Sequence, residues 1–169
     1  MAYEFYVKWD MTKQGKSKGE SPREKRKDWV GGLSYFHEIK SPRDVATGQA
    51  SGKRQHGPIT ITKEWGASTP QIFQALCTNE VIKTVEFEFM KTNANGEEYV
   101  YQTVKLTNAT FSHVKYMTGA GAGEGANSSK HAGSHDTHEL EAVSFSYQKI
   151  EIENKDGKTM AMDDWQAQG

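Results

Sequence analysis

The sequence is short of cysteine and of long apolar segments, and each shortage excludes a class of protein. Among its 169 residues only Cys77 is a cysteine, so the chain alone forms neither an intramolecular disulfide nor a multi-cysteine zinc site. No apolar run approaches the roughly 20 residues of a membrane-spanning helix, so we expect no membrane insertion. We expect Cys77 to be a small, buried apolar side chain.

A signal sequence and an excess of one charge are missing as well. Residues 1–10 contain no basic segment followed by an apolar one, so we expect no Sec-type signal peptide. The protein is therefore expected to be made in the cytoplasm and to be secreted, where it is secreted, without a cleaved signal peptide. Lys and Arg number 21 against 22 Asp and Glu, a net charge of −1, which gives no general attraction to nucleic acid or anionic membranes.

What the sequence does have is alternation of apolar and polar residues. Its length fits a single domain over residues 1–169, which is large enough to bury a hydrophobic core without support from disulfide bonds or metal ions. Period-two alternation predicts strands at residues 2–11, 29–40, 58–63, 81–92, 97–106, 110–117, 137–155 and 158–165. The sum is a mainly β, antiparallel chain that forms a closed or nearly closed barrel.

Turns and phase changes mark where these strands bend. Asn95–Gly96 predicts a hairpin turn, and Asn108–Ala109 predicts a tight link between two strands. The apolar phase of residues 137–155 shifts twice, which indicates bulges that bend a strand around a barrel corner.

One segment has helical spacing. Ser68 or Thr69 supplies a hydroxyl at the N-cap, and Pro70 lies in the first turn, where its missing N–H does no harm. We predict a single short α-helix from Pro70 to Asn79. Apolar residues recur at helical spacing and predict one buried face, made of Ile72, Phe73, Leu76 and Cys77.

Three long loops are predicted at residues 13–28, 41–57 and 119–136, and loops of that length in a compact domain usually have a function. The first is basic, flanked by Trp9 and Trp29, and could bind nucleic acid. Acidic residues interleave with the basic ones and favour a solvated loop or a charged contact between subunits. A nucleic-acid-binding barrel is thus one alternative function. The basic residues are Lys13, Lys16, Lys18, Arg23, Lys25, Arg26 and Lys27.

Motifs that carry chemistry are weak. Residues 121–126 fit G-x-G-x-x-A, but no amphipathic helix follows to hold a pyrophosphate. His131, His135 and His138 lie near two carboxylates and could bind a metal, yet their loop of Gly and Ser favours solvated side chains. We expect no catalytic residue, metal or cofactor, and no enzyme. A small-ligand-binding barrel is a second alternative.

An ordered set of segments resembles the Hcp (haemolysin-coregulated protein) family of type VI secretion tube proteins. The most specific segment is Ala-Ser-Thr-Pro-Gln-Ile-Phe-Gln-Ala-Leu-Cys-Thr at residues 67–78. The resemblance covers nearly the whole chain and keeps its order, with further segments at residues 2–8, 33–37, 47–58, 82–89, 139–152 and 163–165.

The resemblance implies a two-sheet antiparallel β-barrel with one short helix on its side. It implies hexameric rings that stack into a tube inside a contractile sheath and are ejected, with a lumen able to carry effectors. The implied partners are further copies of the chain, the sheath, the spike protein and secreted effectors.

Two sets of site residues follow from that role. Stacking requires a loop that reaches the next ring, and residues 41–57 are long and charged, so we predict a ring-stacking loop with Gly48, Lys53, Arg54 and His56. We predict that the more polar face of the second strand lines the lumen, through Ser34, Phe36 and Glu38.

Overall fold

The computed structural model describes residues 5–19, 26–119 and 139–164. This part of the chain contains twelve strands and one helix, which confirms a mainly β, antiparallel fold. The predicted glycine-rich segment at 121–126 and the three histidines of the third loop lie outside the described residues. The elements are β1 Phe5–Met11, β2 Gly15–Lys16, β3 Val30–Gly32, β4 Ser34–Phe36, β5 Ile39–Lys40, β6 Gln55–His56, β7 Ile59–Glu64, α1 Thr69–Thr78, β8 Ile82–Thr92, β9 Glu98–Met117, β10 Leu140–Ser146, β11 Lys149–Asn154 and β12 Thr159–Asp164. Within these ranges no helix is both long and apolar enough to cross a membrane.

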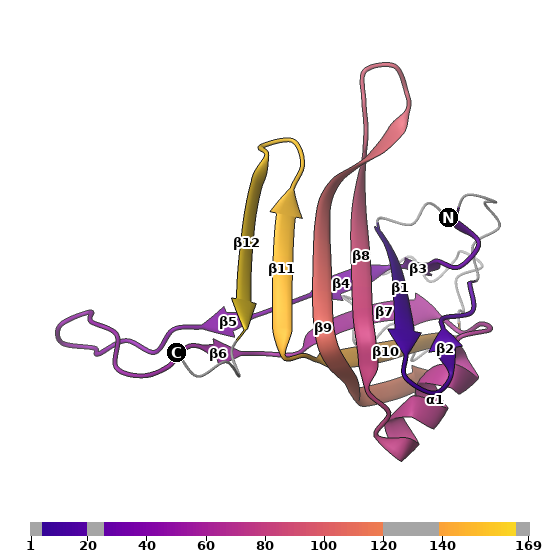
Figure 1. Cartoon of the computed structure of the whole chain (residues 1–169), viewed down its shortest axis with the longest axis horizontal. Coiled ribbons are helices and arrows are strands. Elements are labelled where there is room, and N and C mark those ends of the chain that lie inside the picture. Colours follow the sequence, from indigo (N-terminus) through magenta and orange to yellow (C-terminus); the bar gives the residue numbers. More distant parts are fainter. Residues whose placement is uncertain (1–4, 20–25, 120–138, 165–169) are drawn as a thin grey trace.

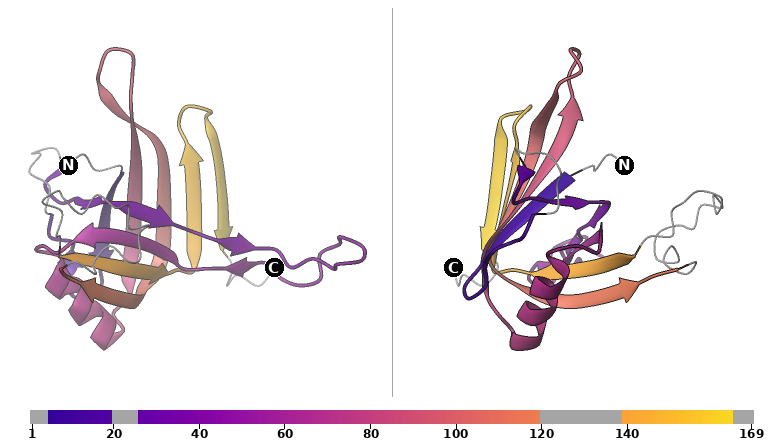
Figure 2. Two further views of the ribbon diagram at one scale, coloured as in Figure 1. Left: turned by 180° about the vertical axis from the view of Figure 1, so that it is seen from behind. Right: turned by 90° about the vertical axis from the view of Figure 1, so that its right-hand side faces the viewer.

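The strands form two layers that share β9 (Figure 1). Residues 98–109 of β9 pair with β8, which pairs with β1, and β11 and β12 extend this first layer on the other side of β9. Residues 110–117 of β9 pair with β10, followed by β7 and β4, in the second layer. Figure 2 shows the two layers diverging from a common edge, which leaves the space between them for the core.

That common edge is a bend at Asn108. The prediction of a link that interrupts the strand there is wrong, because β9 runs on through it. Asn108 has a φ of 51°, a left-handed conformation that asparagine tolerates better than most residues. Its side-chain amide donates to Gln148 Oε1 at 3.1 Å, in the two-residue break between β10 and β11. Residues 137–155 are therefore two strands, and their phase slips mark the place where the chain turns the same corner as β9.

The barrel is not closed, contrary to the closed form that alternation allowed. The segment predicted as one strand at 29–40 divides into β3, β4 and β5. β3 pairs with β1 and β4 pairs with β7, so the two layers are linked across Leu33 without a continuous ladder. The close approach of β3 to β1 requires glycine at position 32. A Cβ atom there would lie 2.0 Å from Cζ of Phe5, which is a steric clash.

The core is a cluster of aromatic and branched side chains from the facing sides of both layers. Trp9 meets Phe111 edge-on at 5.6 Å between ring centroids, and Phe87 meets Phe145 at 5.7 Å. The strand predicted at residues 81–92 is confirmed as β8, with Val85 and Phe87 buried and Phe89 partly buried against the cluster. Burying each such side chain contributes about 1.5–3 kcal/mol, so this interior is filled and holds the layers together.

Helix α1 begins and ends within one residue of its prediction, but its buried face differs. Ile72 and Ala75 are buried and Leu76 is partly buried, whereas Phe73 is 55% exposed and Cys77 is exposed. The prediction of a buried Cys77 is wrong. The short helix rests on the sheet through a stripe at positions i, i+3 and i+4 only, and Phe73 and Cys77 lie one residue beyond that stripe.

A buried ion pair ties the helix to the second layer. Lys63 on β7 and Glu141 on β10 are cross-strand partners, and both side chains are fully buried. The Lys63 ammonium donates to Glu141 Oε1 and to the carbonyl of Glu64. The hydroxyl of Thr69, at the start of α1, donates to the same Glu141 oxygen at 3.0 Å. Alternation alone predicted nothing of this contact.

Replacing one member of this pair should lower the free energy of unfolding far more than replacing both. Glu141→Ala leaves the Lys63 charge buried without its partner, and we expect a loss of about 3–5 kcal/mol in the free energy of unfolding, measured by urea denaturation. Lys63→Met combined with Glu141→Leu should recover most of that loss. Lys8→Ala, which breaks the half-exposed pair with Glu86, is the control and should cost about 1 kcal/mol or less. Equal losses for Glu141→Ala and Lys8→Ala would contradict this account.

Candidate assembly surface

The predicted ring-stacking loop is a projecting hairpin, here called the arm (residues 39–57). Its base is the β5–β6 pair, in which Ile39 faces His56 and Lys40 faces Gln55. Farther out, Arg43 and Ala50 form an isolated bridge. Figure 1 shows the arm extending away from the two layers. The loop is therefore a two-stranded extension and is not structureless.

The tip of the arm is held in one conformation by its own hydrogen bonds. The Asp44 carboxylate accepts hydrogen bonds from the backbone N–H groups of Ala46 and Thr47 at 2.8 and 2.9 Å. The bond from Thr47 has the larger effect, followed by that from Ala46, and together they lower the pKa of Asp44. The N–H of Gly48, whose φ is 72°, donates to the Asp44 carbonyl at 2.8 Å. Between them Val45 is fully exposed. The tip is thus a preformed turn that presents an apolar side chain to solvent.

The other end of the arm is clasped to β12, and we call this contact the arm root (His37, Arg54, His56, Tyr147 and Asp163). Arg54 Nε and Nη2 donate to the Asp163 carboxylate at 2.5 and 2.7 Å, and His56 Nε2 lies 2.6 Å from Asp163 Oδ2. The bond from Arg54, followed by that from His56, outweighs partial burial and holds the pKa of Asp163 below its ordinary value. The carboxylate is therefore ionised at neutral pH.

Tyr147 lies at the centre of the arm root. Its hydroxyl is 2.7 Å from His37 Nε2 and 3.1 Å from His56 Nδ1, and it donates to the Gly57 carbonyl at 3.2 Å. Burial, with a smaller effect of the Asp163 charge, raises the pKa of Tyr147 to about 12, so the hydroxyl keeps its proton. Burial, followed by the neighbouring His56, lowers the pKa of His37.

The structure separates the four predicted stacking residues into two groups. Gly48 belongs to the tip, and Lys53 is exposed along the arm. Arg54 and His56 turn back to the body, and the His56 side chain is only 3% exposed. Sequence reasoning noted Tyr147 and Asp163 only within the segments of resemblance at residues 139–152 and 163–165 and gave neither a role. No local pattern connects them with the arm, because they lie about a hundred residues from it in the sequence.

The predicted lumen residues lie outside the core. Ser34, Phe36 and Glu38 are all exposed, and Phe36 has 62% of its surface accessible. Tyr35 between them points the other way and packs edge-on against Phe87 and Phe89. The alternation on which the prediction depended is therefore confirmed, and the assignment to a lumen stays a prediction.

The outward face of the first layer has one row of alternating charge. Lys8, Glu86, Lys105 and Glu151 are successive cross-strand partners on β1, β8, β9 and β11. Lys8 Nζ lies 3.5 Å from Glu86 Oε2. Opposite charges directly across a ladder attract, so this row largely neutralises itself.

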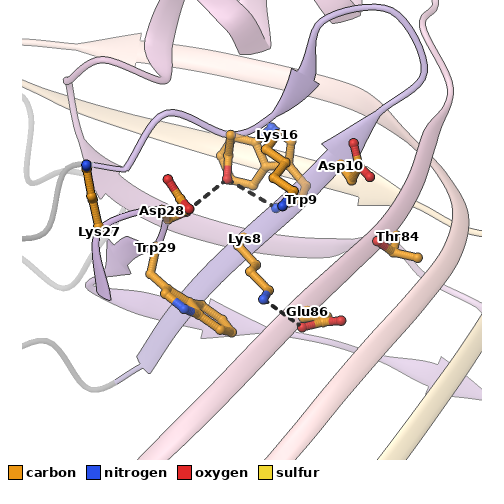
Figure 3. Close-up of a pocket in the computed structure, with 10 residues that line it drawn as sticks. Lys8, Trp9, Asp10, Lys16, Lys27, Asp28, Trp29, Thr84 and Glu86 are labelled. Carbon is orange, nitrogen blue, oxygen red and sulfur yellow. Dashed lines mark hydrogen bonds and ion pairs between the residues drawn. The ribbon is translucent and has the colours of Figure 1, made fainter. Parts of the chain in front are cut away.

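A surface cavity of about 360 Å³ opens beside Lys8 and Glu86, next to the predicted basic loop (Figure 3). Lys8 lies over the Trp29 ring at 4.6 Å from its centroid. The described basic residues here face acidic ones, and Arg26, just outside, bonds to Glu88 at 2.6 Å. This is a mixed cavity and not the uniformly basic groove that a nucleic-acid backbone requires. Its charged lining consists of Lys8, Lys16, Lys27, Asp10, Asp28 and Glu86.

The first layer ends in a strand edge with exposed apolar side chains. Among the described strands β12 pairs only with β11, and Met160 and Met162 on it are 55% and 58% exposed. An unpaired edge with apolar side chains favours association with another chain. No three His, Cys, Asp or Glu side chains of the described ranges gather as metal ligands.

The sequence is similar to known secretion proteins over almost its whole length. Residues 6–153 match the family described as "Type VI secretion system effector, Hcp". The protein called "Major exported protein" in Pseudomonas aeruginosa is 32% identical to this chain over 177 aligned residues, which cover 99% of this chain and 98% of that protein.

Solved structures share the fold. A crystal structure of an Hcp protein has a TM-score of 0.82 at 26% identity, covering 95% of this chain and 98% of its own. A variant of Hcp1 from Escherichia coli EAEC 042 has a TM-score of 0.79 at 27% identity, with 97% and 99% covered. The secreted protein Hcp3 from Pseudomonas aeruginosa has 0.75 at 26%, with 98% and 100% covered. The match of sequence and of fold along the full length shows that the chain belongs to the Hcp family of type VI secretion proteins.

Proposed function

We propose that this chain is the repeating subunit of a type VI secretion tube. Six copies form a ring, rings stack into a tube, and a contractile sheath ejects the tube with its spike and with effectors in the lumen. Family membership supports this role. The single observation that supports it is the arm, because a projecting hairpin with a preformed tip and an exposed Val45 offers a contact surface for a second copy of the chain.

Ring formation requires two different surfaces that meet head to tail and close after a fixed rotation. The first layer offers two such surfaces, since β12 forms one edge and β2 and β3 lie along β1 at the other. Unpaired N–H and C=O groups of an edge strand can bond to a neighbouring chain. Met160 and Met162 add flexible apolar side chains that adapt to a neighbour's surface.

Stacking requires contacts along the tube axis, and the two parts of the arm serve different purposes there. The tip, with Val45 and Gly48, reaches the next ring, and Lys53 adds a charged contact beside it. Arg54 and His56 fix the direction of the arm from its root. Ser34, Phe36 and Glu38 remain the proposed lumen residues, and the sheath, the spike protein and effectors remain proposed partners.

The two alternative functions find less support. The cavity beside the basic loop has both charges, whereas a nucleic-acid groove is dominated by Lys and Arg. A small-ligand barrel encloses its ligand between strands, yet the space between these layers is filled by Trp9, Phe87, Phe111 and Phe145.

Ring formation is tested by native mass. We expect electrospray from neutral volatile buffer to give a dominant species of six 18.9 kDa chains, because the two edges of the first layer are complementary only between copies. A chain that stays a single subunit at the highest concentration it tolerates contradicts the proposed function.

Stacking is tested at the tip of the arm. Val45→Asp places a charge where an apolar contact is proposed, and desolvating it without a partner opposes association. We expect rings of normal mass but tubes at least tenfold shorter by negative-stain electron microscopy, under conditions in which the parent chain forms tubes. Gln74→Asp adds the same charge on the exposed side of α1 and should leave tube length unchanged. Tubes of parental length from Val45→Asp rule out the tip as the stacking contact.

A further inference from the structure

The hydroxyl of Tyr147 has three polar neighbours but only one hydrogen. A phenol donates once and accepts through its two lone pairs. The Gly57 carbonyl can only accept, and it receives the Tyr147 hydrogen at 3.2 Å. The two remaining neighbours, His37 Nε2 at 2.7 Å and His56 Nδ1 at 3.1 Å, must then both donate to the Tyr147 oxygen.

The second nitrogen of His56 is constrained in the same way. His56 Nε2 lies 2.6 Å from Asp163 Oδ2, and Asp163 is a carboxylate because Arg54 bonds to both its oxygens. A carboxylate only accepts, so Nε2 must carry a hydrogen as well. With hydrogens on both nitrogens His56 is an imidazolium. Only in this state are all the bonds around Tyr147 and Asp163 made at once.

Loss of one proton from His56 breaks a bond between the arm and the body. If the remaining hydrogen stays on Nε2, then Nδ1 becomes an acceptor and draws the Tyr147 hydrogen away from Gly57. If the hydrogen moves to Nδ1, the bond to Asp163 is lost instead. In both cases the attraction between the imidazolium and the carboxylate disappears, and the contact between the arm and β12 is weakened, while Arg54 stays bound to Asp163.

Other charged groups around His56 do not replace its charge. Arg54 is already bound to Asp163 through two nitrogens. Glu38 and Lys40 line the same depression as His56, and they form a weak pair with each other at 4.0 Å. His37 is disfavoured as a second cation, since burial and the nearby His56 lower its pKa. One proton on His56 therefore decides whether all the bonds of the arm root are made, with the Arg54–Asp163 pair kept in either state.

We propose that Tyr147 is the positioning residue of the arm, and that its bond to the Gly57 carbonyl and the bond of His56 to Asp163 are both made only while His56 is an imidazolium. The arm is then clamped while that proton is present and loosened once it is lost, so it is held more firmly at lower pH. In the assembled tube this becomes a pH control on stacking, and that consequence alone rests on the proposed function.

The position of the arm is tested without any assembly. A nitroxide on Val45→Cys in a Cys77→Ser background reports the mobility of the tip by electron paramagnetic resonance, and the label itself blocks stacking. We expect the mobile fraction to rise several-fold between pH 5 and 8.5. Tyr147→Phe and His56→Gln should each leave the tip mobile and independent of pH. Tyr101→Phe is the control, since Tyr101 lies on β9, where Lys91 Nζ lies 4.2 Å from the centroid of its ring, and it should keep the full transition.

Each outcome decides the proposal. A flat profile in the parent chain overturns it, and so does a full transition in both Tyr147→Phe and His56→Gln. Tube length of the unlabelled chain is then measured across the same pH range. If tip mobility follows pH while tubes do not, or if no tubes form at all, the proposed stacking role fails and the assignment of Tyr147 stands.

Discussion

The architecture depends on one constraint: a single strand of twenty residues, β9, belongs to two layers and must bend between them. Asn108 supplies the bend, and the break between β10 and β11 lies beside it, so both chain segments turn the same corner. The angle at that corner sets the distance between the layers and hence the volume that Trp9, Phe87, Phe111 and Phe145 fill. It also directs β11 and β12 toward the side from which the arm projects, and so it creates the contact between Asp163 and the arm.

Period-two alternation predicted most of this fold because one side of each layer faces the core. Val85, Phe87 and the apolar side of β7 are examples, and Pro70 with its preceding hydroxyls placed the helix to within one residue. Alternation cannot show where a strand bends without breaking, so β9 was divided and residues 137–155 were joined. It also fails for Cys77, because the width of the stripe that a short helix buries depends on the layer beneath it.

Only part of the candidate site could be predicted from the sequence. Length and charge singled out residues 41–57, and these residues do form an arm that projects from the two layers (Figure 1). The division of that arm into an apolar tip and a clasped root was not predictable, because it depends on partners supplied by distant strands. Tyr147 follows β10 and Asp163 lies on β12. In the sequence, nothing distinguishes either residue from its neighbours in the alternating apolar and polar pattern. Hydrogen-bond donors and acceptors must be counted in three dimensions before such a hub becomes visible.

The pair of Lys63 and Glu141 has a consequence for how this family can diverge. Each residue is tolerable in the interior only because the other is there, so a lineage that changes one of them must pass through a badly weakened ancestor. The folded state of a domain of this size is favoured by only about 5–15 kcal/mol, which leaves little room for such a step. We therefore expect the two positions to be inherited together or exchanged together, and a relative with an apolar residue at one of them to have lost the charge at the other.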